Sequence, residues 1–228
     1  MKTVIKPLLT VVCICFLTVF ANAQATAIKT NYSSSVITET IKFHYGGKLR
    51  THKLSFNASD YNYYKKLGKK EFEPDYAIYA RESSTHAYIE KMAWTLRDEA
   101  EELGLEGTDL VEYLVAFVQE GIPYTVDPEN GGYDYPRFPI ETIIDGKGDC
   151  EDKAALLAAI LNVYGYDAVL LSPPGHMAVG IRCEECDEGT YELEGNKYIY
   201  VETTVKGWPI GIVPPQFASY GEIEVYKP

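Results

Sequence analysis

The chain has 228 residues, of which 33 are acidic and 21 are basic, so its formal net charge is −12. A chain of this length is sufficient for one sizeable hydrophobic core, or for one domain with an appendage. The excess of acidic residues argues against a nucleic-acid partner, because phosphate binding requires clustered lysine and arginine.

The first 23 residues have the features of a Sec signal peptide. Lys2 and Lys6 precede an apolar run over residues 8–20, and residues 21–23 form a small-x-small cleavage site. The run is short for a membrane span and lacks a lipoprotein pattern, so we expect cleavage after Ala23, no stable membrane insertion, and a secreted or periplasmic protein. Cleavage removes two of the 21 basic residues and leaves 19 against 33 acidic ones, a formal charge of −14.

Three cysteines remain after the predicted cleavage. Cys183 and Cys186 lie in a Cys-Glu-Glu-Cys motif, and in an exported protein this spacing favours a disulfide at a hairpin tip, with free thiols or a metal as the alternatives. A structural zinc site needs about four ligands, and no second Cys/His pair lies near this motif, so we expect no metal. Cys150 is left as the odd cysteine.

Residues 24–83 are expected to form an N-terminal extension of the main domain. Alternating apolar residues from Ile37 to Tyr45, the Gly46-Gly47 pair and a second apolar run predict a β-hairpin. The tyrosine-rich segment over residues 60–80 that follows is expected to pack on the main domain, with a groove lining as the alternative.

The first half of the second domain, residues 84–228, is predicted to be helical. Helical periodicity predicts helices over residues 84–103 and 108–121, and each ends at a glycine. An aromatic, proline-rich loop over residues 122–147 separates them from a third, Ala/Leu-rich helix that begins at Cys150.

The chain changes character after Gly165. Short apolar or alternating runs over residues 167–172, 176–183, 197–204 and 222–226, separated by glycine, proline and acidic turns, predict an antiparallel sheet. Helices followed by strands indicate an α+β fold in which the helix that begins at Cys150 packs on the sheet.

Three polar residues are predicted to meet at the ends of these elements. Cys150 opens a helix, His176 heads the second predicted strand, and Glu202 ends the apolar part of the third. The unpaired N–H groups and partial positive charge of a helix N-terminus favour a thiolate, an imidazole can take the thiol proton, and a carboxylate can orient the imidazole.

Acidic residues flank the cysteine and oppose a thiolate. The helix dipole is worth only about 0.3 to 1 kcal/mol, so an imidazolium partner is expected to be necessary. Asp149 is the expected N-cap of the helix, and Asp152 is expected to meet backbone N–H groups or a basic or tyrosine side chain.

The run GKGDCEDKAALLAAILNVYGYDAVLL, with GHMAVGI and YIYVETT further on, resembles the transglutaminase-like superfamily of papain-like fold. The resemblance is to microbial secreted or membrane-associated members with GDCED at the nucleophile, and it is strongest over residues 117–211. It implies that Cys150 is the nucleophile, His176 the general base and acid, and Glu202 the orienting carboxylate. The family commonly has aspartate at the third position, so Glu202 is a departure from its pattern.

The remaining site assignments concern the oxyanion hole and the substrate. The backbone N–H of Cys150 is one expected oxyanion donor, and Gln119 and Tyr135 are the candidates for the second. Tyr133 and Tyr135, in the segment NGGYDYPRFPIET, are hypothesised to line an aromatic groove for an extended peptide or a cell-wall peptide.

A cysteine–histidine–glutamate site transfers an acyl group through a thioester. Water as the acceptor gives a cysteine peptidase or amidase, which we favour, and an amine gives a cross-linking transamidase. A non-catalytic binding module on the same fold is the alternative from another class. No nucleotide-binding, Rossmann or calcium-loop motif occurs, so no cofactor is expected.

Overall fold

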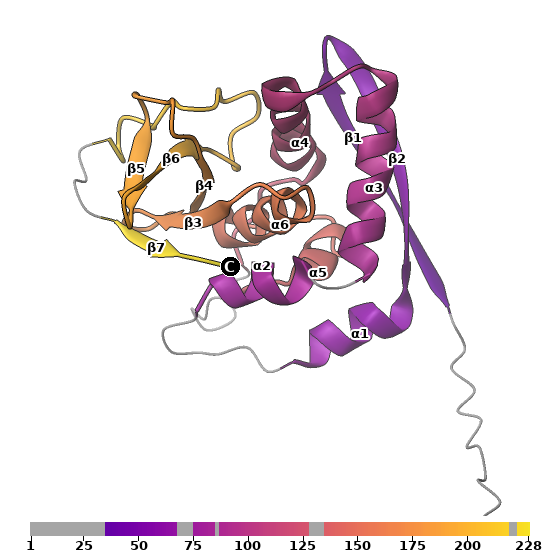
Figure 1. Ribbon diagram of the computed structural model, residues 1–228. Helices are drawn as coiled ribbons and strands as arrows, with labels where there is room; N and C mark the ends of the chain where they lie inside the picture. The colour runs from indigo at the N-terminus through magenta and orange to yellow at the C-terminus, as the bar shows by residue number, and fades with distance from the viewer. Residues whose placement is uncertain (1–34, 68–74, 85–86, 128–134, 219–222) are drawn as a thin grey trace, which may run out of the picture. The chain divides into compact units, whose positions relative to one another are not determined.

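The computed structural model describes residues 35–67, 75–84, 87–127, 135–218 and 223–228 (Figure 1). These residues belong to one compact unit. The predicted signal peptide lies outside them. Within these ranges, no helix has the length and apolar character that crossing a membrane requires.

In the described chain a β-hairpin comes first, the helices follow it, and the strands of the sheet come after the last helix. The helices are α1 (Ala58–Lys66), α2 (Ala77–Ser84), α3 (Ala87–Glu102), α4 (Gly107–Gly121), α5 (Pro139–Ile144) and α6 (Cys150–Val163). The strands are β1 (Val36–Tyr45), β2 (Lys48–Asn57), β3 (Ala168–Ser172), β4 (Ala178–Arg182), β5 (Thr190–Leu193), β6 (Asn196–Val201) and β7 (Glu224–Tyr226).

The predicted hairpin is confirmed as the antiparallel pair β1–β2. Tyr45 pairs with Lys48 across a turn in which Gly46 and Gly47 have φ values of 58° and 72°. Glycine suits both positions because a two-residue turn of this kind requires positive φ at each. The fully buried Phe43 ring packs edge-on against Tyr113 of α4 at a centroid distance of 5.3 Å, so the hairpin shares the core of the helical part.

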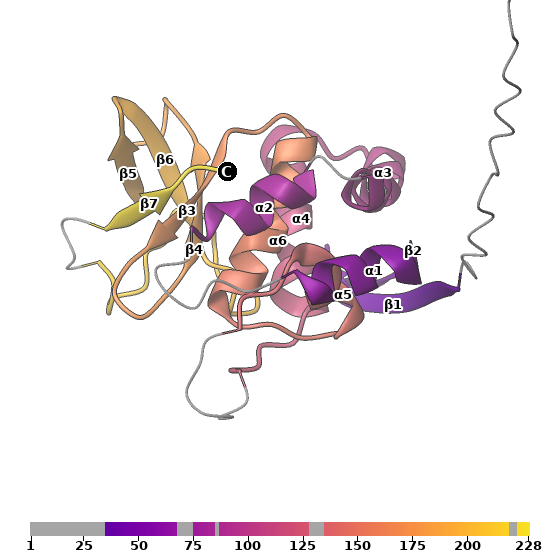
Figure 2. The ribbon, with the colours of Figure 1, turned by 90° about the horizontal axis from the view of Figure 1, so that it is seen from below.

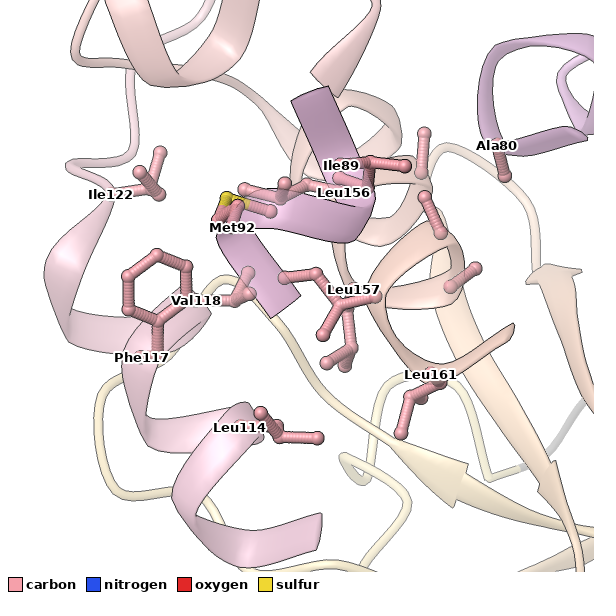
Figure 3. Close-up of a cluster of buried hydrophobic side chains, with 14 of the residues drawn as sticks. Ala80, Ile89, Met92, Leu114, Phe117, Val118, Ile122, Leu156, Leu157 and Leu161 are labelled. Atoms are coloured by element: carbon pink, nitrogen blue, oxygen red, sulfur yellow. The ribbon is translucent and has the colours of Figure 1, made fainter. Parts of the chain in front are cut away.

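Helix α6 lies at the centre of the core, between the sheet and helices α2–α5 (Figures 1 and 2). Residues 154–161 are all buried, as expected for a helix that is apolar on every side. Figure 3 shows leucines of α6 surrounded by apolar side chains of α3 and α4: Leu156, Leu157 and Leu161 with Ile89, Met92, Leu114, Phe117 and Val118. Burial on all sides fixes where the helix begins.

The sheet has the strand order β5-β6-β4-β3-β7, and every pairing is antiparallel. The α+β prediction and its antiparallel sheet are therefore confirmed, with α6 packed against β3 and β4. The strand β5 was not predicted, because the acidic and glycine-rich sequence around it has no apolar run. The outer face of the sheet carries a second, smaller apolar cluster: Val169, Leu171, Ala178, Tyr198 and Tyr200.

Three short helices, α1, α2 and α5, occupy segments in which no helix was predicted. Helix α5 lies in the expected loop and begins at Pro139, where Glu141 accepts a hydrogen bond from the backbone N–H of Phe138 at 3.0 Å. Helix α1 buries Tyr64 against Phe138 at a ring distance of 4.7 Å, so the part of the tyrosine-rich segment in α1 packs on the main core. The helix predicted to begin at residue 84 begins at Ala87 as α3.

The shared core predicts that the hairpin and the helical part unfold together. Phe43→Ala should lower the free energy of unfolding by about 3 to 5 kcal/mol in a single urea transition, because a fully buried phenylalanine is replaced by a cavity. Leu49→Ala, at a hairpin residue that is 55% exposed, is the matched control and should change it by less than about 0.5 kcal/mol. Two separate transitions, of which Phe43→Ala shifts only one, would contradict a common core.

Candidate functional site

Cys150 is the first residue of α6, and the residue before it caps the helix. Asp149 has extended backbone angles, and in a capping box its backbone N–H donates to Asp152 Oδ2 at 3.4 Å. Both acids thus take the helix-start roles expected of them. The first N–H groups of a helix have no acceptor within it, so the Cys150 thiol lies among backbone donors.

His176 and Glu202 are in direct contact. His176 Nε2 lies 3.0 Å from Glu202 Oε2, and the two side chains are 10% and 1% exposed. His176 is two residues before β4, and Glu202 directly follows β6, the neighbouring strand. The pairing of β4 with β6 therefore brings together two of the three residues predicted from the sequence.

The Glu202 carboxylate is saturated with donors. Tyr200 Oη donates to Oε2 at 2.8 Å, while the Thr203 and Thr204 backbone N–H groups and Thr204 Oγ1 donate to Oε1 at 2.7 to 2.9 Å. Burial acts to raise the pKa of Glu202, but His176 and the Thr204 donors outweigh it and lower that pKa to about 2. Glu202 is thus an ionised, fixed acceptor for the imidazole.

The Cys150 thiol lies beside the strand that follows His176. The backbone N–H of Met177, the residue after His176, is close enough to the sulfur to act on its pKa. The Cys150 thiol donates a hydrogen bond from Sγ to Glu151 Oε2, at a distance of 3.1 Å. Burial first, and then the Glu151 and Asp149 carboxylates, raise the pKa of the Cys150 thiol above its usual value.

This raised pKa agrees with the expectation that the flanking acids oppose a thiolate and that the helix N-terminus alone does not produce one. Desolvation and two neighbouring acids act against ionisation, and together they exceed the effect of the Met177 N–H. Ionisation of the Cys150 thiol therefore relies on a proton acceptor such as His176. The His176 ring is fixed by Glu202 at Nε2 and by the ring of Phe217, stacked at 4.6 Å with an interplanar angle of 3°.

Gln119, a candidate oxyanion donor, has another role in the structure. Its Nε2 donates to the backbone carbonyls of Glu202 at 2.8 Å and Trp208 at 3.0 Å, and its Oε1 accepts from the Gly207 N–H at 2.8 Å. Both amide hydrogens are thus used, and the side chain is 6% exposed. Gln119 holds the segment after β6 in place and has no hydrogen left to offer an oxyanion.

Tyr135 is also engaged away from the thiol. Its hydroxyl donates to Glu141 Oε1 at 2.9 Å, and its ring is contacted by Lys65 and Arg137 at 5.4 and 5.3 Å. Burial and the Glu141 carboxylate raise the pKa of Tyr135 to about 12. These contacts make Tyr135 part of the α1–α5 packing, and Tyr133 lies outside the described residues.

Tyr124 is a site residue that the sequence did not indicate. It forms a parallel bridge with Gly148, and the Thr125 N–H donates to the Gly148 carbonyl at 3.0 Å, which places Tyr124 beside the residues that lead into Cys150. Its side chain is 49% exposed, and burial and then the charges of Cys150, Asp149, Glu151 and Glu202 raise its pKa. Tyr124 pairs with Gly148, which is 24 residues away in the sequence. A contact between such distant residues leaves no local sequence pattern that would identify Tyr124 as a site residue.

Three carboxylates cluster near the start of α6. Oxygen atoms of Asp127, Asp149 and Asp152 all lie within 4.8 Å of one another. Arg137 Nη1 donates to Asp127 Oδ1 at 2.7 Å and to Asp152 Oδ2 at 2.6 Å, and the Arg137 backbone N–H donates to Asp152 Oδ1 at 2.6 Å. Because the guanidinium already supplies the positive charge at two of the three acids, we assign no metal to this cluster.

Cys183 and Cys186 are joined by a disulfide in the connection between β4 and β5, with Cα atoms 5.5 Å apart. Cys150 is the free cysteine of the described residues. A thiol reagent is therefore expected to modify Cys150, at the N-terminus of α6.

The sequence matches no family model and no curated protein. Solved structures similar to it include LapG of Legionella pneumophila, at 18% identity and a TM-score of 0.38, over 59% of this chain and 75% of that one. Calcium-bound LapG of the same organism gives 17% identity, a TM-score of 0.40, and coverage of 66% and 81%. A TGase structure gives 16% identity and a TM-score of 0.40 over 82% of this chain and 48% of that one.

The Glu202 network predicts a loss of stability in acid. The unfolded carboxyl has a pKa of about 4.3, and the folded one titrates at about 2, so its contribution is complete above about pH 5 and is lost as the pH falls towards 2. A shift of this size corresponds to about 3 kcal/mol. Urea unfolding at pH 7 and pH 3 should show a smaller pH dependence for Glu202→Gln than for the unchanged protein. Glu192→Gln, at an exposed residue of β5, is the control and should retain the full pH dependence.

The thiol environment predicts that Glu151 restrains Cys150. Glu151→Gln should lower the pKa of the thiol, because it removes the nearest negative charge, and each unit increases the thiolate fraction about tenfold while the pKa exceeds the pH. Alkylation by iodoacetamide at pH 8, followed by intact mass, should become several-fold faster. A rate no higher than that of the Glu192→Gln control would show that Glu151 does not set the thiol pKa.

Proposed function

We propose that this protein is an exported, transglutaminase-like cysteine hydrolase that cleaves peptide or amide bonds through a thioester. The observation that carries the proposal is the contact between His176 and Glu202 at one end of the sheet. The next residue, Met177, directs its backbone N–H at the Cys150 sulfur. The sequence resemblance around the three residues supports the same roles. Cys150 is the nucleophile, His176 the base and acid, and Glu202 the orienting group.

The contacts of His176 give its two ring nitrogens different roles. Nε2 is held by Glu202, so Nδ1 is the nitrogen available to exchange a proton with Cys150. The sulfur attacks the acyl carbon while Nδ1 takes the thiol proton, and the carbonyl electrons move to oxygen. When the oxyanion collapses, the C–N bond breaks and the imidazolium gives its proton to the leaving amine.

Hydrolysis of the thioester reverses these roles. Nδ1 takes a proton from water as its oxygen attacks the acyl carbon, the C–S bond breaks, and the thiol is reprotonated by the imidazolium. The ionised Glu202 stabilises the imidazolium in both steps. Because burial and nearby carboxylates raise the pKa of the Cys150 thiol, the proposed mechanism relies on His176 to take the thiol proton.

The oxyanion donors are proposed to be backbone and tyrosine groups. The N–H of Cys150 lies in the first turn of α6, where N–H groups have no intrahelical acceptor. Tyr124 is exposed beside this turn, so its hydroxyl replaces Gln119 and Tyr135 as the candidate second donor. An acidic protein of this kind is expected to prefer substrates that are not strongly acidic.

The decisive experiment treats the mature protein with peptide and cell-wall-peptide libraries, with and without an added primary amine. Hydrolysis should be lost with Cys150→Ala and reduced at least about 10³-fold in kcat with His176→Ala. A product that carries the amine would assign transamidation instead. The proposal would be excluded if the unmutated protein never forms an acyl-enzyme detectable by mass and Cys150→Ala binds peptides with full affinity. The protein would then be a binding module.

A further inference from the structure

Lys153 is a buried cation next to the proposed site. It follows Cys150 by three residues on α6, and its side chain is 0% exposed. A buried ammonium group costs free energy unless it is hydrogen-bonded and its charge is compensated. Its partners therefore indicate why a lysine is tolerated in the middle of an apolar helix.

The first partners of Lys153 are at the end of another helix. Nζ donates to the backbone carbonyls of Gln119 at 3.1 Å and Ile122 at 2.6 Å. Both carbonyls belong to the last turn of α4 and its C-cap, where acceptors are unpaired and the helix dipole is negative. Lys153 thus fastens α6, which carries the nucleophile, to the end of α4.

The same turn of α4 is fastened to the segment that carries Glu202. The side chain of Gln119 makes three hydrogen bonds to the backbone of this segment, at Glu202, Gly207 and Trp208. Lys153 binds the carbonyl of Gln119 itself. A continuous path of hydrogen bonds therefore runs from the nucleophile helix to the backbone of the carboxylate that orients His176.

Lys153 also acts on the Glu202 carboxylate by its charge. Burial lowers the pKa of Lys153 to about 8, and the Glu202 carboxylate acts in the opposite direction. The Glu202 carboxylate is therefore a charge that acts on Lys153. During turnover His176 alternates between charged and neutral, and a buried carboxylate needs a positive neighbour while the imidazole is neutral.

We propose that Lys153 is a positioning residue that holds the end of α4, and through Gln119 the Glu202 segment, at a fixed distance from Cys150. It also supplies a positive charge to Glu202 that does not depend on the protonation of His176. This inference rests on the function proposed above. In this proposal the buried side chain of Lys153 aligns Cys150 with Glu202, and through Glu202 with His176.

The test compares Lys153→Met with Lys48→Met, which removes an exposed lysine at the hairpin turn. With Lys153→Met, NMR titration of the His176 ring should give a pKa raised by about half a unit or more, because the imidazolium loses a repelling charge beside its partner. The kcat should fall by about tenfold to a hundredfold with KM nearly unchanged, as expected for misaligned groups. Lys48→Met should change neither.

An unaltered His176 titration together with an unaltered kcat in Lys153→Met would overturn the inference and leave the proposed function intact. If Lys153→Met does not fold, NMR of the unmutated protein with ¹³C-labelled lysine decides. One lysine should titrate near pH 8, and the His176 ring signals should show a second inflection there. Lysines that all titrate near their usual value of about 10.4, without that inflection, would exclude the coupling. Coupling seen in a protein without hydrolytic activity would reject the proposed function and retain the link.

Discussion

The burial of α6 on every side is the constraint on which the rest of the structure depends. Its residues 154–161 face the sheet on one side and helices α2–α5 on the others, so the helix has no solvated face along which it could slide or rotate. The position of Cys150 follows from this, because a helix fixed along its length also has a fixed first residue. At this end of α6 backbone N–H groups lack intrahelical partners, and polar side chains surround the helix.

Buried charges around this end form separate, compensated groups. Arg137 serves Asp127 and Asp152, His176 serves Glu202, and Lys153 binds carbonyls at the end of α4. Each group satisfies the requirement that a charge removed from water has partners. The first group shapes the start of α6, and the other two position the Glu202 carboxylate, so the same electrostatic requirement both stabilises the fold and builds the proposed site.

The raised pKa of the Cys150 thiol gives this site a particular character. Cys150 differs from a helix-terminal cysteine with a lowered pKa, because burial and Glu151 act against its ionisation. Reactivity then depends on transfer of the proton to His176 in the presence of substrate. Tyr124 is exposed and pairs with Gly148, two residues before Cys150.

The sequence by itself determined the hairpin, the helices α4 and α6 and most strands of the sheet, because periodicity, glycine turns and capping residues act locally. Its family resemblance singled out Cys150, His176 and Glu202 as a hypothesis, and the structure places the last two in contact. The sequence did not determine the partners of Gln119 and Tyr135, whose amide and hydroxyl could serve several acceptors and were assigned to an oxyanion. Only the tertiary structure decided those partners, the proximity of Tyr124, and the direction of the thiol pKa. Each of these depends on burial and on contacts between distant segments, which a local pattern does not contain.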